Sequence, residues 1–208
     1  MRQVLKKINQ LKKSEVRSLI DSRLAEFKKV GKGGDNGLFN ELCFCILTAN
    51  WQAEGGIRIQ KAMKEEFCSL PQARLAARLR ELGYRFPNVR AGYIAEAQKH
   101  QRGLGGKLKK FDDPIFLREW VVKNVKGLGY KEASHFLRNI GYEDLAILDF
   151  HIIDIMEREG LIERPKTLTP KRYVEIEAVL KELGRKAGLN MAELDMYLWY
   201  METGKVLK

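Results

Sequence analysis

The sequence is poor in cysteine and proline, and it contains no long apolar run. Its 208 residues include three cysteines and five prolines. An odd number of cysteines, without the spacing of a four-ligand site, indicates neither a disulfide framework nor a tetrahedral zinc or iron–sulfur centre. No apolar run approaches the roughly 18 residues of a membrane span, and the opening segment lacks the features of a signal peptide. We therefore expect a cytoplasmic protein in a reducing compartment.

Acidic residues are fewer than basic ones. The 38 lysines and arginines exceed the 27 aspartates and glutamates, which gives a formal net charge of +11. Such a surplus attracts polyanions by neutralising phosphates and releasing their counterions, although it can also merely keep a protein in solution. Apolar residues make up 45% of the chain, enough for the core of one domain or of two closely packed lobes. A nucleic-acid partner is the first expectation.

Sustained alternation of apolar and polar residues is also missing, which argues against strands. Apolar residues recur instead at helical spacing, as in Val16, Leu19, Ile20, Leu24 and Phe27. The pattern predicts an all-α fold of about ten helices joined by short loops. The predicted helices span residues 15–30, 38–49, 52–66, 69–82, 88–101, 114–125, 130–140, 150–159, 170–188 and 190–203.

Several of these helix starts carry a capping signal. Short polar residues that accept from main-chain N–H groups, or a proline in the first turn, are typical of such positions. A Ser or Asn followed three residues later by Gln or Glu forms a capping box. The expected signals are Ser14, the box Ser69 to Gln72, Asn88, Asp113-Pro114, Thr169-Pro170, and Asn190 with Glu193.

Two glycine-containing stretches receive different interpretations. Residues 31–37 lack the preceding strand and the Gly-Lys-Ser/Thr ending of a phosphate-binding loop, so we expect only a surface connection there. Residues 125–133 place Gly127 and Gly129 on either side of one apolar residue, between two helical patterns. Such a hairpin turns tightly, leaves main-chain N–H groups facing solvent, and begins a helix whose positive end can meet a phosphate. An ordinary glycine-capped connection is the alternative.

A lone carboxylate lies in the apolar run 146–153, a short distance after the hairpin. This residue, Asp149, stands at the start of a predicted helix, and with Lys131 of the hairpin it can face one cleft. An aspartate in this place is also a standard N-cap for N–H groups such as that of Ile152. The two roles can hold together.

Five stretches form a pattern that is more specific than any short motif. They are Glu41–Asn50, Ala53–Arg58, Lys126–Gly141, Asp195–Tyr200 and Gly204–Val206. Through them the chain, over nearly its whole length, resembles the helix-hairpin-helix DNA glycosylase superfamily. Within that superfamily it is most similar to the archaeal-type (type 2) 8-oxoguanine DNA glycosylase/lyases. The absence of a cysteine quartet separates it from the iron–sulfur endonuclease III-like branch.

The resemblance implies a fold as well as an activity. It implies an all-α helix-hairpin-helix glycosylase fold, in which two helical lobes flank a DNA-binding cleft. Residues 1–208 would form a single unit of two interleaved lobes. One lobe is expected to comprise about residues 38–125, and the other residues 1–37 together with 126–208.

The resemblance also makes Lys131 the nucleophile. Its neutral amine would attack the sugar C1′ of the damaged nucleotide, expel the base and form a Schiff base that permits β-elimination of the strand. Asp149 would be the second catalytic residue, stabilising positive charge on the sugar as the glycosidic bond breaks, with its cap hydrogen bonds keeping it ionised. No metal and no organic cofactor is expected.

The target nucleotide has to leave the stack before its C1′ can be reached. By resemblance, Asn50 fills the vacated space. The loop with Arg85 and Phe86 suits a wedge or a contact with the unpaired opposite base, although it can equally be a packed turn between helices. Trp199 is a stacking candidate for the base, although a tryptophan among apolar and aromatic neighbours is more often part of a core.

Lys208 is the last residue of the sequence, and the resemblance places it in the base pocket. Guanine N7 accepts a hydrogen bond, whereas N7 of 8-oxoguanine carries a hydrogen, so a nearby carboxylate favours the lesion and repels the normal base. The α-carboxylate of Lys208 is therefore a candidate reader of the base, and its ammonium can pair with the active-site region. A frayed terminus is the alternative.

Further residues are expected at the DNA backbone. Lys126, Gly127 and Gly129 of the hairpin are expected to hold a phosphate, and His151 either contacts a phosphate or is an ordinary helix residue. Phe150 stands where members of the family more often carry a basic residue. This departure puts one phosphate contact in doubt, but not the chemistry.

The leading hypothesis is a bifunctional repair enzyme that excises 8-oxoguanine from double-stranded DNA and cleaves the resulting abasic site. We expect it to act as a monomer, away from membranes and associated with the nucleoid when bound to DNA. One alternative is a non-catalytic helix-hairpin-helix module in which Lys131 only contacts phosphate. Another is a monofunctional glycosylase for a different lesion, although such enzymes activate water with the aspartate and need no lysine in the hairpin.

Overall fold

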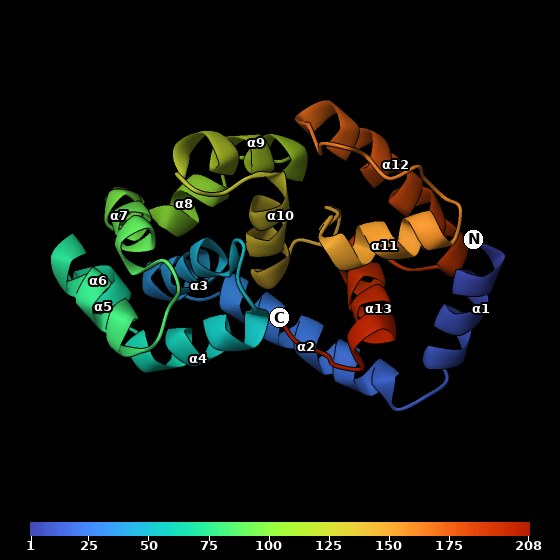
Figure 1. The fold of residues 1–208 in the computed structure, drawn as a ribbon, viewed down its shortest axis with the longest axis horizontal. Coiled ribbons are helices and arrows are strands. Elements are labelled where there is room, and N and C mark those ends of the chain that lie inside the picture. The colour runs from blue at the N-terminus through green and yellow to red at the C-terminus, as the bar shows by residue number, and fades with distance from the viewer.

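Helices account for all of the regular structure. The computed structural model describes residues 1–208 and contains thirteen α-helices, one short 3-10 turn and no strand, which confirms the all-α prediction. Figure 1 shows their arrangement. The helices are α1 (Arg2–Leu11), α2 (Val16–Gly31), α3 (Asp35–Thr48), α4 (Ala53–Met63), α5 (Glu66–Ser69), α6 (Gln72–Glu81), α7 (Pro87–Ala97), α8 (Leu104–Leu108), α9 (Pro114–Asn124), α10 (Tyr130–Asn139), α11 (Phe150–Arg158), α12 (Pro170–Ala187) and α13 (Met191–Thr203).

Three of the six predicted capping signals are confirmed, whereas Asn88 lies inside α7 and does not cap it. The side chains of Asp113, Thr169 and Asn190 each accept a hydrogen bond from a main-chain N–H of the first turn. The Ser14 hydroxyl accepts from the N–H of Val16 at 3.3 Å. The box beginning at Ser69 is wrong, because its hydroxyl donates back to the Glu65 carbonyl and ends the preceding helix.

Short helices explain why the structure has more elements than predicted. The expected helix 52–66 breaks at Lys64, whose φ is +35°, and divides into α4 and α5. The five-residue α8 is too short to show a periodic apolar pattern. Helix α1, which buries Val4 and Ile8 four positions apart, was not among the predicted helices. The expected stretch 88–101 ends as a helix at Ala97 and finishes in the 3-10 turn.

The glycine-rich stretch 31–37 is only partly a connection. Gly31 is the last residue of α2, and residues from Asp35 onward belong to α3. A Cβ on Gly31 would lie 1.9 Å from the carbonyl oxygen of Ile140, so only glycine allows α2 to approach the end of α10 this closely. The sequence therefore carries a packing requirement where we expected a surface loop.

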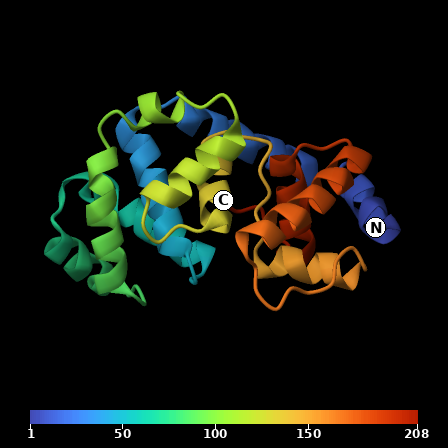
Figure 2. The ribbon, with the colours of Figure 1, turned by 90° about the horizontal axis from the view of Figure 1, so that it is seen from above.

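Buried apolar side chains form two clusters. The first contains residues between Leu38 and Leu145, and the second combines residues 4–27 with residues 146–198. Figures 1 and 2 show the corresponding helices as two groups, with α10 at the boundary between them. We propose that each cluster is the core of one lobe. On this proposal the boundary lies near residue 145, after the hairpin, and not at the expected residue 125.

Candidate active site and DNA-binding hairpin

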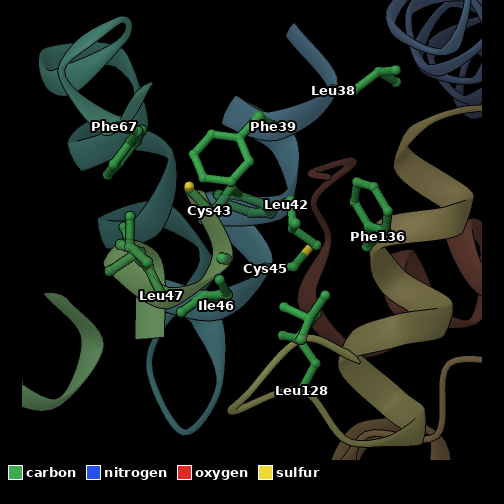
Figure 3. Close-up of a cluster of buried hydrophobic side chains, with 14 of the residues drawn as sticks. Leu38, Phe39, Leu42, Cys43, Cys45, Ile46, Leu47, Phe67, Leu128 and Phe136 are labelled. Carbon is green, nitrogen blue, oxygen red and sulfur yellow. The ribbon is translucent and has the colours of Figure 1, made fainter. Parts of the chain in front are cut away.

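The hairpin joins α9 to α10 through a tight glycine turn. Gly127 has a φ of +88°, and a Cβ there would lie 2.3 Å from the ring of Tyr93, so this position requires glycine. Between the two glycines, Leu128 is buried and points into the same cluster as Cys45 and Phe136 (Figure 3). The apolar anchor fixes the turn, while Gly127 and Gly129 on either side remain exposed.

Main-chain donors around this turn are unused inside the protein. The N–H groups of Lys126, Gly127, Tyr130 and Lys131 have no acceptor in the structure. The N–H of Gly129 points to the Glu132 carboxylate at 3.3 Å. Free N–H groups at the start of a helix form a site for an anion such as phosphate. Lys126 is exposed beside them, 3.6 Å from Glu96.

A cleft of about 820 Å³ lies between the two clusters. Its walls come from the turn after α3, one face of α10, residues 147–151, α13 and the end of the chain. Six of the predicted site residues line it, and they are Asn50, Lys131, Asp149, His151, Trp199 and Lys208. The other five, Lys126, Gly127 and Gly129 of the hairpin and Arg85 and Phe86 of the loop before α7, do not line it.

Lys131 enters the cleft from the first turn of α10. Its side chain is 26% exposed, and its ammonium lies 3.0 Å from a carboxylate oxygen of Glu132. The other carboxylate oxygen of Glu132 accepts from Gly129, so one side chain links the hairpin to the lysine. Sequence reasoning missed Glu132, although its place as the third residue of a helix after a capping position is a recognisable signal.

Asp149 is carried by an extended link between the two clusters. The link is held from one side by α12, because the N–H of Ala146 donates to Glu177 at 2.8 Å. The hydroxyl of Tyr173 donates to the Ala146 carbonyl at 2.7 Å and accepts from the N–H of Leu148 at 3.2 Å. These bonds set the main chain immediately before Asp149, and so they aim its side chain.

The carboxylate of Asp149 is both an N-cap and a cleft residue. It accepts from the N–H of Ile152 at 2.9 Å, which confirms the predicted cap. Burial raises the pKa of Asp149 above the ordinary value, and the N–H of Ile152 and the charges of His151 and Lys131 offset only part of this effect. The cap bond to Ile152 favours the ionised form as expected, but burial has the larger effect on this pKa.

The floor of the cleft is a chain of buried polar groups. Arg138 pairs with Asp195 and also donates to the side-chain carbonyl of Asn139. Burial raises the pKa of Asp195 to about 6, against the lowering effect of Arg138. Asn139 donates in turn to Glu41 at 2.7 Å.

Sequence reasoning missed two residues of this cleft, His135 and Arg138, which it could have found by their spacing from Lys131. Lys131, His135 and Arg138 are separated by four and then three positions, so they share one face of α10, and all three line the cleft. Burial lowers the pKa of His135 well below its ordinary value, so its imidazole is neutral. Asp195, on α13, gave no comparable local signal.

The aromatic wall is formed by α13 and the start of α11. Trp199 is half-buried in the cleft wall, and its ring meets the edge of the His151 ring with centroids 4.8 Å apart. The indole N–H of Trp199 is buried without an acceptor, so it is available to a ligand. Phe150 is 65% exposed and lies against the His151 ring.

Asn50 lies exposed at the cleft rim, in a turn with a φ of +59°. The loop before α7 supports this turn from behind. The hydroxyl of Tyr84 donates to the Leu47 carbonyl at 2.6 Å, and Arg90 donates to the Ala49 carbonyl at 2.7 Å. The Arg85 guanidinium stacks over the ring of Phe86, 4.9 Å from its centroid. The two predicted gap-filling elements are therefore neighbours.

A hairpin with free main-chain donors, followed by a cleft that holds a lysine and an aspartate, is the arrangement of helix-hairpin-helix DNA glycosylases. The structure contains no group of three or more His, Cys, Asp or Glu side chains that could hold a metal ion. No helix is both long and apolar enough to cross a membrane.

The chain belongs to the 8-oxoguanine DNA glycosylase family, whose sequence profile matches residues 20–189. It is 50% identical to an 8-oxoguanine DNA glycosylase/AP lyase of Korarchaeum cryptofilum, over 97% of this chain and 96% of that protein. It is 48% identical to a protein of the same name from Methanocaldococcus jannaschii, over 99% of both. The crystal structure of the M. jannaschii 8-oxoguanine glycosylase/lyase with a 15mer DNA containing 8-oxoguanine matches 99% of this chain and 100% of that one, with a TM-score of 0.96 and 47% identity.

Proposed function

We propose that this chain is a bifunctional repair enzyme that excises 8-oxoguanine from double-stranded DNA and then cleaves the abasic site. The observation that carries the proposal is that Lys131 and Asp149 line one cleft directly beside the phosphate-binding hairpin. The family relationship supports the choice of 8-oxoguanine. Both residues come from one chain, so we propose a monomer, and one that works at the nucleoid of a prokaryotic cell.

The reaction follows from the chemistry of an amine beside a sugar. The neutral amine of Lys131 forms a bond to C1′ as the C1′–N9 bond breaks, and the electron pair leaves with the purine, which takes up a proton. Opening of the sugar ring then gives a Schiff base. Loss of a proton from C2′ expels the 3′ phosphate and breaks the strand. Asp149, when ionised, stabilises the positive charge that develops on the sugar.

Glu132 supports Lys131 in a way that distinguishes the resting enzyme from the reacting one. In the structure the Lys131 ammonium is paired with this carboxylate at 3.0 Å. We propose that the Lys131 amine leaves Glu132 and turns toward the sugar once the nucleotide enters the cleft. Glu132 also accepts a hydrogen bond from the N–H of Gly129. A phosphate that arrives at the hairpin competes for this N–H and so weakens the hydrogen bond between Gly129 and Glu132.

The DNA contacts divide between the hairpin and the cleft rim. The free N–H groups near Gly127 and Gly129 bind a backbone phosphate, and Lys126 adds a charge. Asn50 fills the space that the rotated nucleotide leaves, and Arg85 with Phe86 contacts the unpaired opposite base. These two elements support each other through Tyr84 and Arg90.

Base recognition is assigned to Trp199 and Lys208. The Trp199 ring offers a surface for stacking, and its unpaired indole N–H offers one donor. The Lys208 ammonium donates to Glu41 at 2.7 Å, and the α-carboxylate of Lys208 is the group that accepts a hydrogen bond from the base. An acceptor gains a hydrogen bond from N7–H of 8-oxoguanine and none from N7 of guanine. The His151 ring packs perpendicular to the Trp199 ring and orients this platform.

The proposal is tested with a duplex that carries one 8-oxoguanine, alongside an undamaged duplex. We expect free 8-oxoguanine to be released and the strand to be cut at that position, with neither product from the undamaged duplex. Release of the base without strand cleavage would indicate a monofunctional glycosylase. Salt-sensitive binding to both duplexes without either product would indicate a non-catalytic module.

A further inference from the structure

The last five residues run from one core to the other. They follow α13, whose buried side chains belong to the second cluster, and end against α3, which belongs to the first. Both views in Figures 1 and 2 place the end of the chain beside α10, between the two groups of helices. This segment, residues 204–208, forms one wall of the cleft through Lys205, Leu207 and Lys208.

The segment ends on a buried carboxylate. Glu41 is 3% exposed and accepts from Gln60 at 3.1 Å, from Asn139 at 2.7 Å and from the Lys208 ammonium at 2.7 Å. Gln60 and Asn139 are neutral, so Lys208 is the one cation bonded to Glu41. Such a charge is costly to bury without its partner.

The Lys208 side chain is fixed from a second direction. It is 17% exposed, and its ammonium lies over the ring of Phe44, 4.5 Å from the centroid. The main-chain carbonyl of Lys208 faces the ring of His135. This contact acts to raise the pKa of His135, whereas burial lowers it. Residues at a chain end are normally poorly ordered unless they are held in such a way.

A second ion pair in the same segment provides a contrast. Lys205 pairs with Glu54, but both side chains are 56% exposed. Exposed pairs of this kind are screened by water and salt and contribute little. The position of the segment therefore depends on the buried pair and not on the exposed one.

We infer that Glu41 is a positioning residue for base recognition: it holds Lys208, and with it residues 204–208, as a fixed wall of the base-binding cleft. This inference rests on the proposed role of Lys208 in reading the base. Glu41 itself touches no part of the nucleotide. It acts by keeping the main-chain oxygen of Lys208, which faces the ring of His135, at the wall of the cleft, and so it affects base excision more than cleavage of a site that has no base.

The hold on Lys208 can be measured without any activity. Carboxypeptidase B removes a C-terminal lysine, and intact mass spectrometry of the 208-residue chain follows its loss. We expect the wild type to resist, Glu41→Gln to lose Lys208 about tenfold faster, and the matched control Glu54→Gln to behave like the wild type. Equal rates for Glu41→Gln and the wild type would overturn the inference.

The effect on recognition is measured as a ratio. We compare the single-turnover rate of 8-oxoguanine excision with the rate of cleavage at a preformed abasic site. This ratio should fall about tenfold in Glu41→Gln and in Lys208→Met, and no further in the double variant, because both changes break one contact. The Lys208→Arg variant can still pair with Glu41, so it should keep most of the wild-type ratio. Equal losses of both rates, or additive losses in the double variant, would contradict a positioning role.

The two proposals fail in distinguishable ways. If Lys208→Met leaves the excision ratio intact while carboxypeptidase still finds Lys208 protected by Glu41, the hold exists but Lys208 does not read the base. If Lys208→Met lowers the ratio while Glu41→Gln changes neither readout, Lys208 reads the base without help from Glu41. Thermal unfolding of each variant separates both results from a general loss of structure, and Lys208→Met changes only the final side chain.

Discussion

The hairpin and the cleft floor prepare for the same DNA by opposite means. The hairpin presents N–H groups that have no partner in the protein, on exposed main chain around Gly127 and Gly129. The cleft floor presents buried side chains that are already paired, such as Arg138 with Asp195 and Glu41 with Lys208. Main-chain donors at a surface cost little to leave unpaired because water satisfies them, whereas buried charges require partners. On the proposed function, the hairpin binds a phosphate regardless of sequence, and the cleft selects the base.

Substitutions of two lysines in the hairpin region should separate DNA binding from chemistry with the largest effect. Lys131→Gln should lower excision and strand cleavage by about a thousandfold or more, because the amine that bonds to C1′ is gone. DNA affinity should change little. The matched variant Lys126→Gln removes an exposed cation from the same hairpin, and it should weaken binding a few-fold while chemistry on bound DNA persists. Single-turnover rates and fluorescence anisotropy measure the two effects, and a Lys131→Gln enzyme with normal excision would refute the assignment.

Asp149→Asn tests the cleft without removing a helix cap. Asparagine caps as well as aspartate, so the hydrogen bond to Ile152 should persist while excision falls about a hundredfold. The folded pKa of Asp149 is raised, so ionisation of this group destabilises the folded state as pH rises through that pKa.

The stability of this variant therefore has a predicted pH dependence. Relative to the wild type, Asp149→Asn should gain stability as pH rises from acid to neutral, and urea unfolding at a series of pH values measures this difference. If the free energies of unfolding of the two proteins changed in parallel with pH, the pKa of Asp149 would not be raised in the folded state. Loss of excision with a large loss of stability at every pH would show that the cap was the main role of Asp149.

Gly127→Ala tests the hairpin without touching the cleft. The new Cβ would meet the ring of Tyr93 at a φ of +88°, so we expect a loss of about 1–3 kcal/mol in stability and weaker DNA binding. Gly37→Ala is the control, since a Cβ there meets nothing within 4 Å on a helix. It should leave binding unchanged and stabilise slightly. Urea unfolding and anisotropy with both variants check this, and equal behaviour would mean that the turn adapts.

Phe150→Arg addresses the border between the two regions and should have the smallest effect. The phenylalanine is exposed beside Asp149, so it adds no phosphate contact. An arginine there should add one, which steepens the dependence of log affinity on log salt by about 0.9. Anisotropy titrations over a series of salt concentrations measure the slope. An unchanged slope would place residue 150 away from the DNA backbone.

The sequence predicted the hairpin far better than the cleft floor, for a physical reason. A glycine turn, a capping aspartate such as Asp113 and a helix start such as Asn190 depend on neighbours within a few residues, so local pattern is sufficient. Lys131 and Asp149, whose catalytic roles were expected from the family resemblance, line one cleft. The contact between Glu41 and Asn139 joins residues 98 positions apart, and no local pattern specifies such a pair.

Two predictions from local pattern met a contact between residues far apart in the sequence. Gly31 looked like part of a surface loop, because its requirement for glycine comes from Ile140 on another helix. The expected lobe boundary at residue 125 stays a prediction, and the proposed boundary near residue 145 differs from it because side chains after the hairpin pack into the first cluster. In both cases the deciding contact lies across the packing of α2, α3 and α10.

The central claim is that Lys131 forms the covalent bond to DNA, and borohydride trapping followed by peptide mapping tests it most directly. Borohydride reduces the Schiff base to a stable amine, and mass spectrometry then locates the sugar remnant on the chain. With a duplex containing one 8-oxoguanine, we predict a single adduct on Lys131 and none with an undamaged duplex. An adduct on another lysine, or excision without any adduct, would contradict the account.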